Sequence, residues 1–215
     1  MGQRKPLCHK APPSVAPFQA LVAPASQSPG EHPNILRMKR MSGFTLIEAL
    51  VTMTVVAVLV SAAVPSFKTS IQNGRLVTQA NDLLGALLYA RSQAVASTGN
   101  VVVCTTTDNS SCSSAGNWAN GWLVATTDSS GAIVTVLRVQ TALAGNNTLT
   151  NDASVKKITF TKGSGIPTAG TNIYFTLCDS RGKTFGRSIY LSQVGEARVS
   201  PTVGYKIDST AIGSC

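Results

Sequence analysis

GFTLIEALVTMTVVAVLVSAAVPSF, residues 43–67 of the 215-residue chain, contains a single charged side chain, that of Glu48. At about 1.5 Å per residue, a helix of this length can cross a hydrocarbon core of about 30 Å. We therefore expect residues 44–67 to form a membrane-spanning helix. The whole chain has 43% hydrophobic and 13% charged residues, which is too few charges for a disordered protein.

Two basic residues, Lys39 and Arg40, precede this apolar segment. The positive-inside rule then places the N-terminal end of the helix in the cytoplasm. A secretory signal peptide is the alternative, because it also has basic residues before an apolar run. The run is long for a signal peptide, however, and an ionised carboxylate costs at least ~2.5 kcal/mol toward the bilayer centre. Glu48 therefore needs a partner or a function, unless its side chain reaches back to the headgroups.

Residues 1–37 contain seven of the ten prolines and no helical or strand periodicity. Each proline removes a backbone donor, so this stretch is expected to be disordered and not part of the fold. Met38 and Met41 lie just before the apolar segment. The true start codon is thus Met1, Met38 or Met41, and the sequence leaves the choice open.

The segment Met-Ser-Gly43-Phe44-Thr-Leu-Ile-Glu48 resembles the processing signal of type IV pilins and pseudopilins. In that family a short basic leader ends in Gly and is followed by Phe-Thr-Leu-Ile-Glu and an apolar helix. The resemblance implies cleavage of residues 1–43 by a prepilin peptidase and N-methylation of Phe44. It also places Glu48 at the position of the family's acid that acts in assembly, and Pro65 at the position of the family's helix-bending proline.

The resemblance gives Glu48 a physical role in assembly. The α-amino group of a mature N-terminus is mostly protonated at neutral pH, and methylation keeps it cationic. In a filament, the Glu48 carboxylate of one subunit would neutralise the Phe44 ammonium of the next. Because an unpaired buried charge is costly, this pairing would favour one axial register.

After Pro65 the helical pattern becomes amphipathic, with apolar residues three and four positions apart up to Val95. We expect one helix over about 45–97, half membrane anchor and half packing surface. Arg91 lies where the GspH/FimT group of minor pilins has an Ala-Arg-Ser-Glu-Ala segment, although Gln93 replaces the Glu. Arg91 is interpreted as a solvated or structurally paired residue.

Beyond residue 100, short β-branched and aromatic segments predict antiparallel strands. The turn-forming residues Asp128–Gly131 predict a hairpin loop. Trp118 and Trp122 are expected on one strand face. The segments 105–114 and 145–154 are rich in Ser, Thr and Asn and are expected to be exposed loops. The predicted fold is α+β and pilin-like, with residues 68–215 forming a periplasmic head of antiparallel sheet on the helix. The predicted strands are 101–106, 118–126, 133–139, 155–162, 172–178, 187–192 and 197–200.

The chain has five cysteines, and four remain if Cys8 leaves with the leader. Export would place these four where disulfides form. Of the three possible connectivities, Cys104–Cys112 and Cys178–Cys215 are favoured, because the first closes a local loop and the second ties down the terminus. A zinc site is the alternative, but residues 44–215 contain no histidine and the Cys spacings match no zinc motif.

The same lack of histidine excludes a Ser-His-Asp triad and a Cys-His pair from the mature chain. No P-loop or Rossmann fingerprint is present either. The acids of the head are scattered through turn-like segments. We therefore expect neither an enzyme nor a cofactor or metal.

The net charge of +9 suggests nucleic acid as a partner, but six of the eighteen basic residues lie in residues 1–43. The mature chain has twelve basic and eight acidic residues, a net charge of +4. Some FimT-type pilins bind DNA through a Gly-Arg-x-Arg motif, and the matching residues here are Gly195 to Arg198, with Glu196 in place of the first Arg. That acid adds repulsion toward phosphate, and solvated cations are the alternative reading. The candidate DNA contacts are Arg181, Lys183, Arg187 and Arg198.

The expected function is that of a minor pilin in a type IV pilus that primes assembly near the tip. The alternatives are a DNA-binding pilus subunit for natural transformation and a minor pseudopilin of type II secretion. The implied partners are other major and minor pilins, the prepilin peptidase/N-methyltransferase and the bacterial inner membrane, with DNA as a further candidate.

Overall fold

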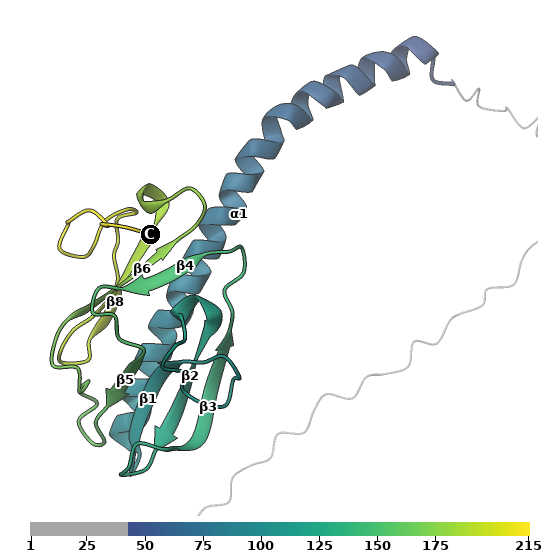
Figure 1. Ribbon diagram of the computed structural model, residues 1–215. Coiled ribbons are helices and arrows are strands. Elements are labelled where there is room, and N and C mark those ends of the chain that lie inside the picture. The colour runs from purple at the N-terminus through teal and green to yellow at the C-terminus, as the bar shows by residue number, and fades with distance from the viewer. Residues whose placement is uncertain (1–42) are drawn as a thin grey trace, which may run out of the picture. The chain divides into compact units, whose positions relative to one another are not determined.

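The computed structural model describes residues 43–215, and its first element is the helix α1 (Leu46–Ala96) (Figure 1). The predictions for the leader, the start codon and Cys8 lie outside the described residues. α1 continues through Pro65, and Figure 1 shows it curving between its free half and the half that lies against the head. The predicted helix over 45–97 is confirmed.

The two halves of α1 differ in what surrounds them. Every residue from 43 to 71 is exposed, whereas a buried face begins at Leu76 and repeats every three or four residues. The first half has a mean hydropathy of 2.3 over 18 residues and meets the length and composition expected of a membrane-spanning helix. The buried apolar residues of the second half are Leu76, Ala80, Leu83, Ala86, Leu87, Ala90 and Ala94.

Three hydroxyl groups in the apolar half form hydrogen bonds within the helix. Thr52, Thr54 and Ser61 each donate to the carbonyl oxygen three residues earlier, at 2.7–2.9 Å. A polar group without a partner is expensive in hydrocarbon. These hydroxyls are therefore compatible with a lipid environment.

The head contains two four-stranded antiparallel sheets, in the orders β3-β2-β1-β5 and β4-β6-β7-β8. Both sheets and α1 contribute to one core, in which Trp118 stands edge-on to Phe175 with ring centroids 5.0 Å apart. The predicted α+β, pilin-like class is confirmed, with two sheets in the head. The strands are β1 (Asn100–Thr105), β2 (Gly121–Thr127), β3 (Ile133–Thr141), β4 (Thr148–Asn151), β5 (Lys157–Phe160), β6 (Ile173–Cys178), β7 (Arg187–Leu191) and β8 (Ala197–Val199).

Two local predictions were wrong. Trp118 lies in a short 3₁₀ helix, η1 (Trp118–Asn120), and not on the strand that carries Trp122. The Asn117 side chain accepts a hydrogen bond from the Ala119 amide at 3.1 Å and starts this turn. The segment 145–154, expected to be a loop, contains β4, whose Leu149 is buried in the core.

Candidate functional site

The N-terminal residues of the described chain lead directly into α1. Gly43, Phe44 and Thr45 precede the helix, and Glu48 lies in its first turn, where an acid interacts favourably with the helix dipole. A β-carbon added at Gly43 would meet nothing within 4 Å. The fold itself therefore does not require glycine at position 43.

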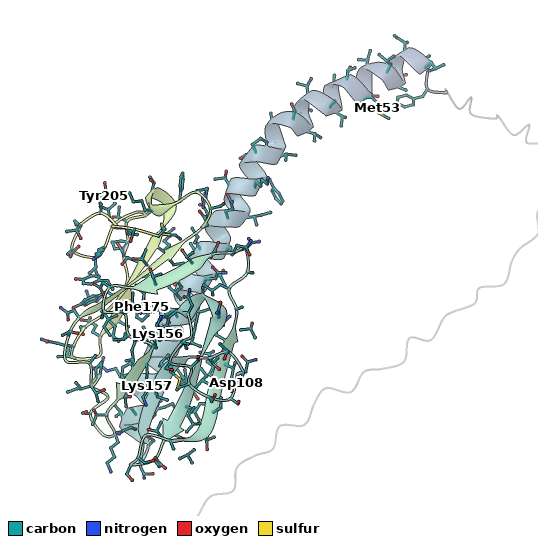
Figure 2. All side chains as sticks on the ribbon, in the orientation of Figure 1. Met53, Asp108, Lys156, Lys157, Phe175 and Tyr205 are labelled. Carbon is teal, nitrogen blue, oxygen red and sulfur yellow. A yellow bond between two sulfur atoms is a disulfide. The ribbon has the colours of Figure 1, made fainter. Side chains whose placement is uncertain are left out.

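The apolar half of α1 presents large side chains to its surroundings on all sides. Leu46 is 90% exposed and Met53 is 77% exposed, and Figure 2 shows Met53 on this half, away from the head. An apolar surface of this length needs a bilayer or other apolar helices around it.

Arg181 joins the segment after β6 to α1. Its guanidinium donates to the Asp179 carboxylate at 2.7 Å and to the Asn73 side chain at 2.8 Å, and it lies over the Phe185 ring at 4.4 Å. The Asp179 side chain is only 4% exposed. Burial acts to raise the pKa of Asp179, but hydrogen bonds from the Arg181 side chain and amide outweigh it, so this pKa lies below its ordinary value of 3.8.

This lowered pKa makes the contribution of Asp179 to stability pH-dependent. The contribution is complete above the ordinary pKa and is lost as the pH falls through the lower, folded-state pKa. We expect Asp179→Asn to reduce the unfolding free energy by about 2 kcal/mol at pH 7. In urea titrations the difference from the unchanged protein should shrink below about pH 3.8. A difference that stays constant down to pH 2 would contradict this role.

Three of the four candidate DNA contacts lie beside α1, and the fourth lies on the neighbouring strand β8. Arg187 lines a cleft of about 360 Å³ together with Asn73 and Leu76 of α1, on the same side as Arg181. Lys183 is exposed on η2 (Lys183–Phe185) in the same segment. These three residues lie at the end of the head where α1 emerges (Figure 1).

Arg198 lies on β8, opposite Tyr190 of β7 and three residues along that strand from Arg187. Its guanidinium is paired with the Glu196 carboxylate, the acid that replaces arginine in the DNA-binding motif. The adjoining turn packs on the later part of α1, because a β-carbon at Gly195 would come within 3.3 Å of Arg91 Nε.

DNA binding by this surface stays a prediction, and a salt-dependent gel shift tests it with the head, residues 68–215. All buried residues of the described chain begin at Leu76, so this fragment keeps the whole core. A DNA site would give a shift at low salt that Arg198→Ala weakens. No shift at low salt, or a shift that Arg198→Ala leaves unchanged, would exclude the motif as the DNA contact.

Arg91 has a structural position that its place in the sequence did not reveal. Gly165, with φ +63°, lies so close that a β-carbon there would come within 2.9 Å of Arg91 Cγ. The Arg91 side chain thus packs on the backbone of two glycine turns, at Gly165 and Gly195. Sequence spacing alone could not have identified these neighbours.

The structure contains both favoured disulfides, Cys104–Cys112 and Cys178–Cys215, with Cα atoms 5.5 and 5.7 Å apart. The first covers the outer face of the β1–β2 pair, where Cys112 packs on a small apolar cluster. The second attaches the C-terminal tail to the end of β6. Chain-entropy estimates give roughly 2.5 kcal/mol for the shorter loop and roughly 4 kcal/mol for the longer one.

Within residues 43–215, no group of three or more His, Cys, Asp or Glu side chains is placed to hold a metal ion. The acids at turns accept hydrogen bonds from backbone amides. Asp108 accepts them from Ser110 and Ser111, and Asp128 accepts them from Ser130 and Ala132. Hydrogen bonds from serine side chains and neighbouring amides lower the pKa of both Asp108 and Asp128. These carboxylates therefore stabilise loops.

The chain is similar to known proteins along most of its length. The family described as type II transport protein GspH matches residues 79–195, and the prokaryotic N-terminal methylation motif matches residues 38–64. Two crystal structures of the type IV minor pilin FimU from Pseudomonas aeruginosa are similar to it, with 28% and 26% sequence identity and TM-scores of 0.53 and 0.51. The matches cover 67% and 65% of this chain and 97% and 99% of those chains. A comparison with curated proteins finds no significant match.

Proposed function

The chain belongs to the GspH family of type II transport proteins, and from this membership we propose how it is processed, anchored and used. It is a minor pilin or pseudopilin, with the family's methylation motif and a FimU-like fold. We propose that a prepilin peptidase removes residues 1–43, that Phe44 is then N-methylated, and that the subunit helps to prime a type IV pilus near its tip.

The observation that best supports this proposal is the change of environment along α1. Residues 43–71 are all exposed and mostly apolar, whereas the following residues form the buried spine of the head. A single helix with these two halves suits a subunit that is first anchored in a bilayer and later packs its apolar half among other pilin helices. In the proposed orientation the N-terminal end of α1 is cytoplasmic and the head is periplasmic, as Lys39 and Arg40 predict.

Gly43→Leu tests the proposed processing site. The space around Gly43 is open, so the substitution should leave the fold unchanged and act only on recognition by the peptidase. We expect only the unprocessed form on an immunoblot, while the unchanged chain gives the mature size. A band of mature size from Gly43→Leu would show that cleavage occurs elsewhere.

A pseudopilin of type II secretion is the second candidate, and the description of the matched family favours it. Deleting the gene distinguishes a type IV pilus subunit from a secretion pseudopilin. Loss of surface pili with normal secretion of exported enzymes is expected for a type IV pilus subunit. Normal piliation with defective secretion would instead identify a secretion pseudopilin.

A further inference from the structure

The end of the head from which α1 emerges carries basic and apolar side chains together. We propose that this end binds the surface of a bilayer containing anionic phospholipids while the subunit is anchored. The inference rests on the proposed membrane anchoring. It adds a second contact, between the head and the lipid headgroups.

The rise along α1 gives the distance between this end of the head and the lipid. From Phe67, the last residue of the apolar segment, to Asn73 the helix rises about 9 Å. The headgroup layer extends about 5–8 Å beyond the hydrocarbon core on each side. Asn73 receives a hydrogen bond from Arg181 at 2.8 Å, so the segment after β6 is held just above the headgroups.

Several basic side chains are available at this level. Lys68 follows the apolar segment directly and is exposed, and Lys183 is exposed on η2. Arg187 is half-buried and lines the cleft of about 360 Å³ beside Asn73. Among the salt bridges of residues 43–215, none involves these three side chains. Lys183 Nζ donates a hydrogen bond to the Gly213 carbonyl at 3.5 Å, which leaves its charge unpaired and open to lipid phosphates.

Apolar side chains surround the same cleft. Phe185 is 39% exposed and Val203 is 38% exposed, and both line the cleft. Tyr205 is 45% exposed, and Figure 2 shows it at this end of the head. The C-terminal tail is held here, because the Gly204 amide donates to the Gly186 carbonyl at 2.9 Å. Aromatic side chains beside Lys and Arg are typical of protein surfaces at the membrane interface.

The acidic side chains of this end have basic partners: Asp179 is paired with Arg181, and Asp208 in the C-terminal tail interacts with Lys206. Asp128 lines a pocket with Ser97 and Gly99, at the opposite end of α1 and about 36 Å from Asn73 along the helix. Glu196 is paired with Arg198. Lys68, Lys183 and Arg187 thus add positive charge to this end, within about one Debye length, ~8 Å, of the headgroups.

The test uses mature protein, residues 44–215, in nanodiscs of phosphatidylcholine alone or with phosphatidylglycerol. Hydrogen exchange is measured for the amides of residues 180–187. With phosphatidylglycerol we expect about fivefold slower exchange than with phosphatidylcholine, and loss of the difference in high salt. Lys183→Glu with Arg187→Glu should abolish the difference.

Lys157→Glu with Lys162→Glu is the matched control, because it makes the same charge change at exposed positions. Lys162 lies beside Ser97 to Asn100, at the far end of the head. This control should keep the lipid-dependent protection. Since Arg187 is half-buried, Lys183→Glu alone supplies a second variant that should fold normally and reduce the protection.

Equal exchange in both lipids, or protection that the Lys183 variants leave intact, would overturn the inference while the protein is still inserted. Protection that arises only when other pilins are added would assign this end to a protein partner and would also overturn it. Failure of the unchanged protein to insert into either nanodisc would instead contradict the membrane anchoring in the proposed function. The two failures are therefore distinguishable.

Discussion

Glu48→Ala is expected to be processed normally and yet to be nearly absent from filaments. The carboxylate lies in the first turn of an apolar helix half whose residues are all exposed in the single subunit. When such helices pack together, the proposed partner of Glu48 is the N-terminal ammonium of Phe44 in a neighbouring subunit. Removing one member of a buried ion pair costs about 3–5 kcal/mol, which corresponds to a loss of incorporation of at least about 100-fold.

The measurement is the amount of the chain in sheared filaments relative to the amount in the membrane fraction. Asp82→Ala is the matched control, because it removes a carboxylate from the part of α1 that lies in the head. It should be incorporated like the unchanged chain. Normal incorporation of Glu48→Ala would argue strongly against the assembly role of this acid.

Trp118→Ala is expected to cause the largest loss of stability in the head. The Trp118 side chain is 1% exposed, packs edge-on against Phe175, and donates from its indole nitrogen to the Val155 carbonyl at 2.8 Å. The substitution removes these contacts and leaves a cavity where both sheets and α1 meet. Truncations of this kind cost about 3–5 kcal/mol.

Urea unfolding of residues 68–215, with both disulfides intact, gives this loss directly. Val134→Ala is a suitable control, since Val134 is 65% exposed on β3 and its truncation should change stability by no more than about 0.5 kcal/mol. A loss below about 1 kcal/mol for Trp118→Ala would contradict its place in the core.

The helix could be predicted from sequence because its signal is long and regular. The apolar run has one charge over residues 44–67, and the buried residues after Leu76 recur at helical spacing. The hairpin at Asp128 was also predictable, because Asp, Ser and Gly favour a turn between two apolar strands. Each of these signals is local in the sequence.

The misplaced elements depended on information that is not periodic. Trp118 and Trp122 are four residues apart, a spacing that fits one strand face. The Asn117 cap and the positive φ of Gly121 instead bound a 3₁₀ turn that holds Trp118 before β2 begins. β4 has only one buried apolar residue, Leu149, so its polar sequence resembles a loop. Tertiary pairing with β6 decides its structure.

The candidate contacts in the head show a different limit of sequence reasoning. Arg181, Lys183, Arg187 and Arg198 lie close together in the chain and were predicted as one DNA-binding group. The hydrogen bond between Arg181 and Asn73 spans 108 residues of sequence and holds the first part of this group against α1. Arg198 is instead paired with Glu196. The β7–β8 register nevertheless keeps Arg198 three residues along the sheet from Arg187.

Mass spectrometry of the N-terminal peptide, recovered from sheared filaments, tests the central claim most directly. The account predicts a peptide that begins at Phe44 and carries one added methyl group. Absence of the chain from filaments, or an N-terminus at a residue other than Phe44, would contradict it.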